Sequence, residues 1–142
     1  MRATPYLFTV LFCLMFATSA NAQESLWRAC VDAPNATNLD VNDCLSGKLK
    51  AEQGALDAFM NEQLAAARDT DASMRADEPD SMFAVQEAKL KASHAAFTAY
   101  RDADCDRVYY GYTGGSGANT ANLICQLEHT HERIRLLKAE IQ

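Results

Sequence analysis

Two cysteines frame the segment whose residue types are best suited to binding or chemistry. Between Cys105 and Cys125 the chain is rich in tyrosine and glycine. Rigid aromatic side chains beside small residues are typical of binding loops, although glycines also serve to allow positive φ. Some of the tyrosines could instead pack beneath the loop. The residues that we predict to contact a partner are Tyr109, Tyr110, Tyr112, Gly114, Gly115, Ser116 and Gly117.

The titratable and nucleophilic residues of the same region do not match a catalytic or metal-binding pattern. Ser116 has no His–Asp relay that would activate it as a nucleophile. His129 and His131 are two residues apart, which places them about 200° apart around a helix. A shared metal would require a spacing of four residues. The sequence therefore predicts no enzyme activity, no cofactor and no metal.

The first 22 residues have the features of a cleavable secretion signal. Arg2 provides a positive start, residues 7–16 are continuously apolar, and residues 20–22 read Ala-Asn-Ala. The apolar run is shorter than the roughly 20 residues of a membrane-spanning helix. Cys13 follows a bulky phenylalanine, which does not fit a lipid-attachment signal. We therefore expect cleavage after Ala22, no membrane anchor in the mature protein, and a periplasmic or secreted location.

The expected mature chain, residues 23–142, has the length of one domain. The chain has a formal net charge of −6, and removal of the signal, which holds one basic and no acidic residue, gives −7. Nucleic-acid binding needs a basic surface, so the charge argues against it and against binding to anionic lipid. A cationic partner is favoured, because complementary fields speed encounter. Solubility alone would also explain an acidic surface.

Four cysteines remain after cleavage, namely Cys30, Cys44, Cys105 and Cys125. An even number in a short exported chain indicates two disulfides, and three pairings are possible. We favour Cys30–Cys44 and Cys105–Cys125, because each pair is close in sequence and brackets a turn-rich segment. The other pairings remain open. A zinc site is the competing interpretation, but the C-x-x-C spacing common in such sites does not occur.

Three helices must position these residues. Apolar residues recur at helical spacing in three stretches, whereas residues 23–40 are predicted to form an irregular arm and residues 69–80 a connection. No strand-like alternation occurs, so the sequence predicts an all-α, up-down-up bundle of three helices. In this topology Cys44, Cys105 and Cys125 lie at the same end of the bundle, which we call the disulfide-stapled pole. The tyrosine-rich loop between Cys105 and Cys125 would cap this end. The helices are expected to begin near Asp40–Asn42, Asp80–Ser81 and Asn119 and to end near Arg68, Cys105 and Glu140.

Three motifs follow one another in the C-terminal half of the chain. They are Tyr100-Arg101-Asp102 before Cys105, Gly114-Gly115-Ser116, and Cys125 followed by Thr130, Arg133 and Leu137. In this order they resemble the LprI-like lysozyme inhibitor family of bacterial exported proteins. Cys30 and Cys44 stand where that family places its first two cysteines, and the likeness covers about residues 30–137. His94 and Phe97 depart from it, because the family usually has Gln and Trp there.

The resemblance implies a small helical binding protein that needs no catalytic residues. The expected function is inhibition of a lysozyme, preferably a cationic one, by occlusion of its substrate groove. The alternative is a structural or accessory module of the cell envelope that binds peptidoglycan or another envelope protein. A structural role is expected for Tyr100, Arg101, Asp102 and Arg133, in which hydrogen bonds of the Arg101–Asp102 pair, together with Arg133, would fix the stapled pole. The alternative is that this charged cluster beside the loop contacts a partner.

Overall fold

The computed structural model describes residues 26–140, and their regular structure is entirely helical. A short helix covers residues 26–31. It is followed by α3 (Asn38–Asp77), α4 (Gln86–Gly111) and α5 (Ala118–Ala139). The described part contains no β-strand, which confirms the predicted all-α class. The expected signal sequence, residues 1–22, lies outside the described residues.

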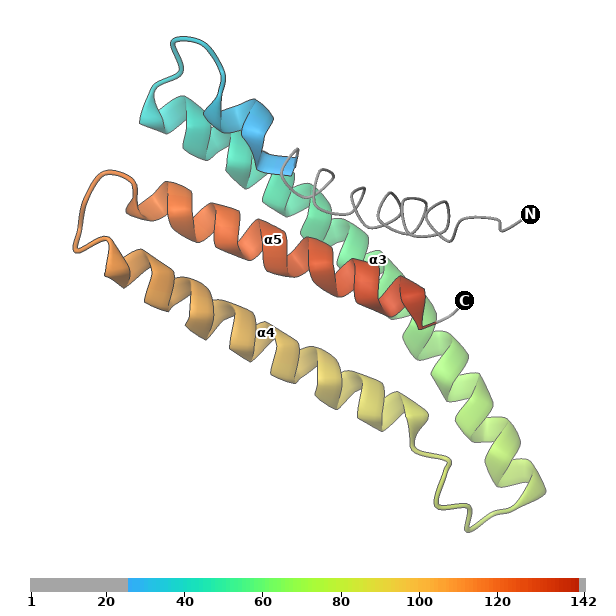
Figure 1. The fold of residues 1–142 in the computed structure, drawn as a ribbon. Helices are drawn as coiled ribbons and strands as arrows, with labels where there is room; N and C mark the ends of the chain where they lie inside the picture. The colour runs from blue at the N-terminus through green and yellow to red at the C-terminus, as the bar shows by residue number, and fades with distance from the viewer. Residues whose placement is uncertain (1–25, 141–142) are drawn as a thin grey trace, which may run out of the picture.

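The three long helices pack against one another in every pairwise combination. Figure 1 shows α4 and α5 side by side, joined by a short loop at one end of the molecule, while α3 runs along α5 and extends beyond its C-terminal end. The connection from α3 to α4 lies at the opposite end from that loop (Figure 1). Among the described helices, none combines the length and the hydrophobicity needed to cross a membrane.

The first long helix begins earlier than the sequence suggested. The hydroxyl of Thr37 accepts a hydrogen bond from the Asp40 N–H at 3.3 Å, and the Asp40 carboxylate accepts one from the Thr37 N–H at 2.9 Å. This reciprocal capping box satisfies two backbone donors at the start of α3. The predicted cap at Asp40 or Asn42 is therefore wrong, and the predicted irregular arm contains the helix of residues 26–31.

The same helix also ends later than expected, at Asp77 instead of Arg68. Its C-cap is Glu78, which has extended backbone angles (φ −139°, ψ 98°) and precedes Pro79. Proline disfavours the helical conformation of the residue before it, so the helix stops there. The acidic segment before it, predicted as a connection, contains no breaker and remains helical. The second helix consequently begins at Gln86, several residues after the predicted start.

Asp71 of α3 caps the start of α4 from a neighbouring helix. Its side chain is buried, and its two carboxylate oxygens accept hydrogen bonds from the N–H groups of Gln86 (2.8 Å) and Glu87 (3.0 Å). The residue in the N-cap position, Val85, provides no side-chain hydrogen bond. A helix N-terminus leaves backbone donors unsatisfied and favours negative charge. Asp71 therefore fixes where α4 begins and how it packs on α3.

Glu87 joins the same two helices through an ion pair that should weaken in acid. Hydrogen bonds, first from Arg68 and then from Lys91, lower the pKa of Glu87 from 4.5 to about 2. A carboxylate whose pKa is depressed on folding stabilises the protein above its unfolded pKa, and this contribution is lost as the pH falls through the folded value. We therefore expect Glu87→Gln to reduce the loss of Tm between pH 4.5 and pH 2, measured by thermal unfolding followed by circular dichroism.

Glu62→Gln provides the control for this experiment, because it removes a carboxylate from an exposed position of α3. It should leave the acid dependence of Tm close to that of the unmodified protein. If both substitutions reduce the loss of Tm in acid equally, overall charge, and not the Glu87 ion pair, governs acid unfolding.

The core has two layers along the long axis of the molecule. The first surrounds Leu45 and Leu127 near the disulfides, and the second surrounds Leu56, Met60 and Ile134. Most fully buried residues come from α3 and α5, whereas Cys105 is the one residue of α4 in this class. Helix α4 is therefore held against the others by half-buried side chains, the Asp71 cap and its disulfide.

Candidate functional site

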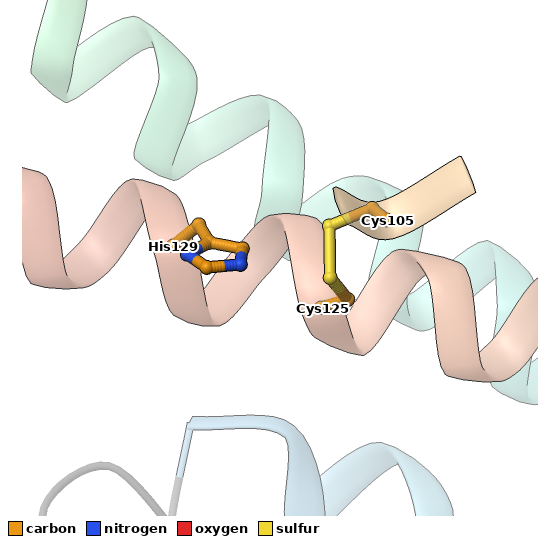
Figure 2. Close-up of side chains that lie close together, drawn as sticks. All are labelled: Cys105, Cys125 and His129. Atoms are coloured by element: carbon orange, nitrogen blue, oxygen red, sulfur yellow. A yellow bond between two sulfur atoms is a disulfide. The ribbon is translucent and has the colours of Figure 1, made fainter. Parts of the chain in front are cut away.

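Two disulfides lie at the end of the molecule where α4 and α5 are joined. Cys30–Cys44 ties the short helix of residues 26–31 to α3, with a Cα–Cα distance of 5.7 Å. Cys105–Cys125 ties α4 to α5, with a Cα–Cα distance of 5.6 Å, as Figure 2 shows. These are the two pairs that the sequence favoured, and they fix the frame from which the tyrosine-rich loop projects.

The loop is shorter than predicted, because α4 continues to Gly111 and does not end near Cys105. Tyr109 and Tyr110 therefore lie in the last helical turn, with their rings edge to face at 5.3 Å. Tyr112 is the C-cap residue. Tyr110 is 74% exposed and Tyr112 50% exposed, whereas Tyr109 is half-buried, so two of the three tyrosines of this segment are presented to solvent.

Residues 112–117 form a tight turn that is held by its own backbone. Thr113 and Gly114 have positive φ angles of 48° and 78°, which Gly114 adopts without strain. The Gly115 N–H donates to the Tyr112 carbonyl oxygen at 2.9 Å. A Cβ atom at Gly115 would approach that oxygen to 3.2 Å, so glycine fits this close approach. Gly114, Gly115 and Ser116 are exposed. The turn is therefore compact and presents these three residues to solvent.

Arg101 connects α4 with α5. Its Nε and Nη2 atoms donate to Asp102 Oδ1 at 2.9 and 2.8 Å, and its Nη1 donates to the buried Thr130 hydroxyl at 3.5 Å. Only 12% of the Arg101 side chain is exposed. The hydrogen bonds between Arg101 and Asp102 match the arrangement expected from the sequence, and Thr130 is a contact that the sequence did not suggest.

The two other residues expected in this network lie elsewhere. Arg133 donates to the Ser93 hydroxyl at 2.8 Å, and its guanidinium lies 5.7 Å from the centre of the Phe97 ring. Arg101 also faces this ring, at 5.8 Å, so Phe97 is the link between the two arginines. Tyr100 is 59% exposed and meets the His129 ring edge to face at 5.2 Å. Tyr100 is thus a surface residue beside α5.

An open groove of about 480 Å³ runs between α4 and α5 below the loop. Three carboxylates line it, from Asp104, Glu128 and Glu132, and the lining residues that the structure describes include no lysine or arginine. Tyr112 closes the end next to the loop. This groove was not predicted from the sequence. The lining residues are Asp104, Val108, Tyr112, Ala121, Ile124, Cys125, Glu128, His129 and Glu132.

Ion pairs lower the pKa of two of the groove carboxylates, Asp104 and Glu132. Arg107 is the main cause that lowers the pKa of Asp104, with His129 the second partner at 3.0 Å. Arg135 likewise lowers the pKa of Glu132. Both arginines are solvent-exposed and lie outside the lining of the groove. Asp104 and Glu132 are therefore ionised at neutral pH and take part in ion pairs at the surface.

Cys105, Cys125 and His129 are close enough to suggest a metal centre, because their ligand atoms all lie within 4.8 Å of one another (Figure 2). The two sulfur atoms are bonded to each other, whereas zinc is bound by thiolates. The oxidised protein therefore offers one ligand here, the His129 imidazole. His131 lies 3.3 Å from Glu52 of α3, so the two histidines face different helices.

The family model described as Lysozyme inhibitor LprI matches residues 30–137. This range includes both disulfides, the loop and the groove, and it covers well over half of the chain. No curated protein and no solved structure matches.

Proposed function

The chain belongs to the LprI lysozyme inhibitor family, and on this basis we propose that it is an exported inhibitor that binds a basic lysozyme and occludes its substrate groove. Family membership is the observation that carries the proposal. Occlusion requires a surface that fits the enzyme, and it requires no catalytic residue and no cofactor in the inhibitor.

The inserting element that we propose is the segment from Tyr109 to Gly117. Two of its tyrosines are largely exposed, and exposed tyrosines are frequent energetic anchors of interfaces. The turn is held by its own hydrogen bonds, and the disulfide Cys105–Cys125 fixes the two helices that carry it. A loop ordered before binding loses less conformational entropy in the complex, which favours tight association.

The charge of the chain supports a basic partner. With a formal net charge of −6, the protein would attract a cationic lysozyme over several ångströms, and the association rate would fall as salt is added. Two disulfides suit an oxidising compartment. We propose that residues 1–22 are removed after Ala22 and that the mature protein acts in the periplasm or outside the cell, where it would meet a lysozyme.

The test is lysis of a bacterial cell-wall suspension by a cationic animal lysozyme, titrated with the purified, oxidised protein. We expect dose-dependent inhibition. Tyr110→Ser should weaken it by about tenfold to a hundredfold, because truncation of an interface anchor costs about 2 kcal/mol or more.

Phe83→Ser is the matched control. Phe83 is 63% exposed and lies in the connection between α3 and α4, at the other end of the molecule from the loop (Figure 1). This variant should inhibit as well as the unmodified protein. If both variants inhibit equally, the loop is not the inserting element.

The alternative function is that of a cell-envelope module that binds peptidoglycan or an envelope protein through the same loop. Exposed tyrosines also suit stacking against sugars, so the loop alone does not separate the two functions. Binding of the protein to isolated cell wall in the absence of any lysozyme would favour the module.

A further inference from the structure

The groove between α4 and α5 adjoins the loop and shares Tyr112 with it, but its other lining residues belong to the two helices and have a chemistry of their own. Its volume of about 480 Å³ lies within the range of about 300–1,000 Å³ that is usual for pockets that hold small ligands or side chains. Its walls include the apolar side chains of Val108 and Ile124, and its polar groups are Asp104, Glu128, Glu132 and His129. A long side chain with an apolar stem and a cationic head fits this combination.

The carboxylates are available to such a cation. Arg107 and Arg135, which pair with Asp104 and Glu132, have exposed side chains (72% and 57%). Exposed ion pairs contribute little to stability, so a cation buried by docking can replace them at little cost. Glu128 is oriented by Trp27, whose Nε1–H donates to its Oε1 at 2.9 Å, and this bond involves no competing positive charge.

Two tyrosines flank the carboxylates. Tyr112 forms the end of the groove next to the loop. Tyr100 lies against His129, which lines both this groove and a smaller adjoining hollow of about 240 Å³. Aromatic faces attract ammonium and guanidinium groups, and guanidinium groups bind carboxylates with two parallel hydrogen bonds. The tyrosines and carboxylates therefore favour the same kind of ligand.

We propose that the α4–α5 groove binds an arginine or lysine side chain that projects from the basic partner protein, held by Glu128, Glu132 and Asp104 beside Tyr112. The inference rests on the proposed function for the identity of the partner. It adds a second contact to that of the loop: the loop enters the groove of the lysozyme, while a basic residue of the lysozyme enters the groove of this protein.

The first test measures the Kd of a cationic lysozyme for the double variant Glu128→Gln/Glu132→Gln by titration calorimetry. Glutamine keeps the shape of each side chain and the acceptor for Trp27 but removes the charge. Hydrogen bonds to charged groups are stronger than those between neutral groups, so we expect Kd to rise by at least about tenfold. The control Asp57→Asn/Glu62→Gln removes the same charge from exposed positions of α3 and should change Kd by less than about threefold.

The second test does not depend on lysozyme. A tri-arginine peptide is added to the ¹⁵N-labelled protein, and the amide shifts are followed by NMR. We expect saturable shifts confined to residues around the groove, absent in Glu128→Gln/Glu132→Gln and absent when tri-citrulline, which is uncharged and of similar shape, replaces tri-arginine. Shifts spread over the acidic surface of α3, or no shifts, would overturn the inference.

The two tests separate failure of the groove from failure of the proposed function. If the unmodified protein binds lysozyme and the groove variant binds as tightly as its control, the groove inference is wrong and the proposed function stands. If no lysozyme binds but tri-arginine shifts the groove residues, the proposed function is wrong and the groove remains a site for basic side chains. If neither binds, both are wrong.

Discussion

Replacing Cys105 and Cys125 together by serine is expected to lower the free energy of unfolding by about 3 kcal/mol, the loop-closure entropy of a cross-link of this length. The two cysteines are 20 residues apart in sequence. A large effect is expected because little of α4 is buried: Cys105 is the one buried residue of this helix. Without the cross-link, half-buried side chains and the hydrogen bonds of Arg101 with Thr130 and of Asp104 with His129 would hold the loop end of α4 against α5. Urea denaturation followed by circular dichroism measures the change.

The Cys30→Ser/Cys44→Ser variant is the comparison for this prediction. Its disulfide ties the short helix of residues 26–31 to α3 and does not touch α4. Both variants should be less stable, but only the loss of Cys105–Cys125 should speed amide hydrogen exchange in residues 106–117. If the denaturation midpoint of the Cys105→Ser/Cys125→Ser variant is unchanged, α4 is held by other contacts and the account of its attachment is wrong.

Asp71→Ala is expected to lower the free energy of unfolding by about 2–3 kcal/mol. Hydrogen bonds to a charged acceptor contribute about 1.5–3 kcal/mol, and a donor left unsatisfied in the interior adds a penalty. Asp71 is 3% exposed and accepts from two backbone N–H groups at the start of α4. Alanine would leave both donors without that partner. Asp71→Asn should lose less, because one amide oxygen can still accept.

Asp69→Ala is the matched control for Asp71, because Asp69 is an exposed acid two positions away in the same helix. Surface substitutions of this kind usually change stability by no more than about 0.5 kcal/mol. If Asp69→Ala and Asp71→Ala lower the free energy of unfolding equally, the Asp71 cap on α4 does not contribute to stability, and the effect comes from the loss of an acidic residue from α3.

Some of the fold could be predicted from local sequence signals. The start of α5 at Ala118 and its end at Ala139 each lie one residue from the expected positions, because a glycine-rich segment and the periodic apolar residues define this helix clearly. The all-α class follows from the absence of alternating patterns. The cysteines indicated where the chain is cross-linked, since closely spaced pairs bracketed turn-rich segments.

Other boundaries depend on contacts that the sequence does not display. Residues 69–77 are acidic and polar, which is typical of a connection, yet they are helical to Asp77. Their position is fixed by Asp71, whose hydrogen bonds reach α4 across 15 and 16 residues. At the C-terminal end of α4, the cysteine suggested an end near residue 105, but nothing breaks the helix before Gly111.

The acidic groove was missed because its members are far apart in sequence. Asp104 belongs to α4, whereas Glu128 and Glu132 belong to α5. The disulfide supplies the register that brings them together. Asp104 precedes Cys105, and the two glutamates follow Cys125 by three and seven residues, which places them on one face of a helix. The favoured pairing of Cys105 with Cys125, combined with these spacings, therefore contained the information that places the three carboxylates together.

Cleavage of a soluble chito-oligosaccharide by a cationic lysozyme, measured with increasing amounts of the oxidised protein, is the most direct test of the central claim. No cell wall is present, so a protein that merely coats peptidoglycan has nothing to protect. Occlusion of the lysozyme groove predicts competitive inhibition, in which the apparent KM rises and kcat is unchanged. Unimpaired cleavage of the soluble substrate at every concentration, with each lysozyme class tried, would contradict the proposed function.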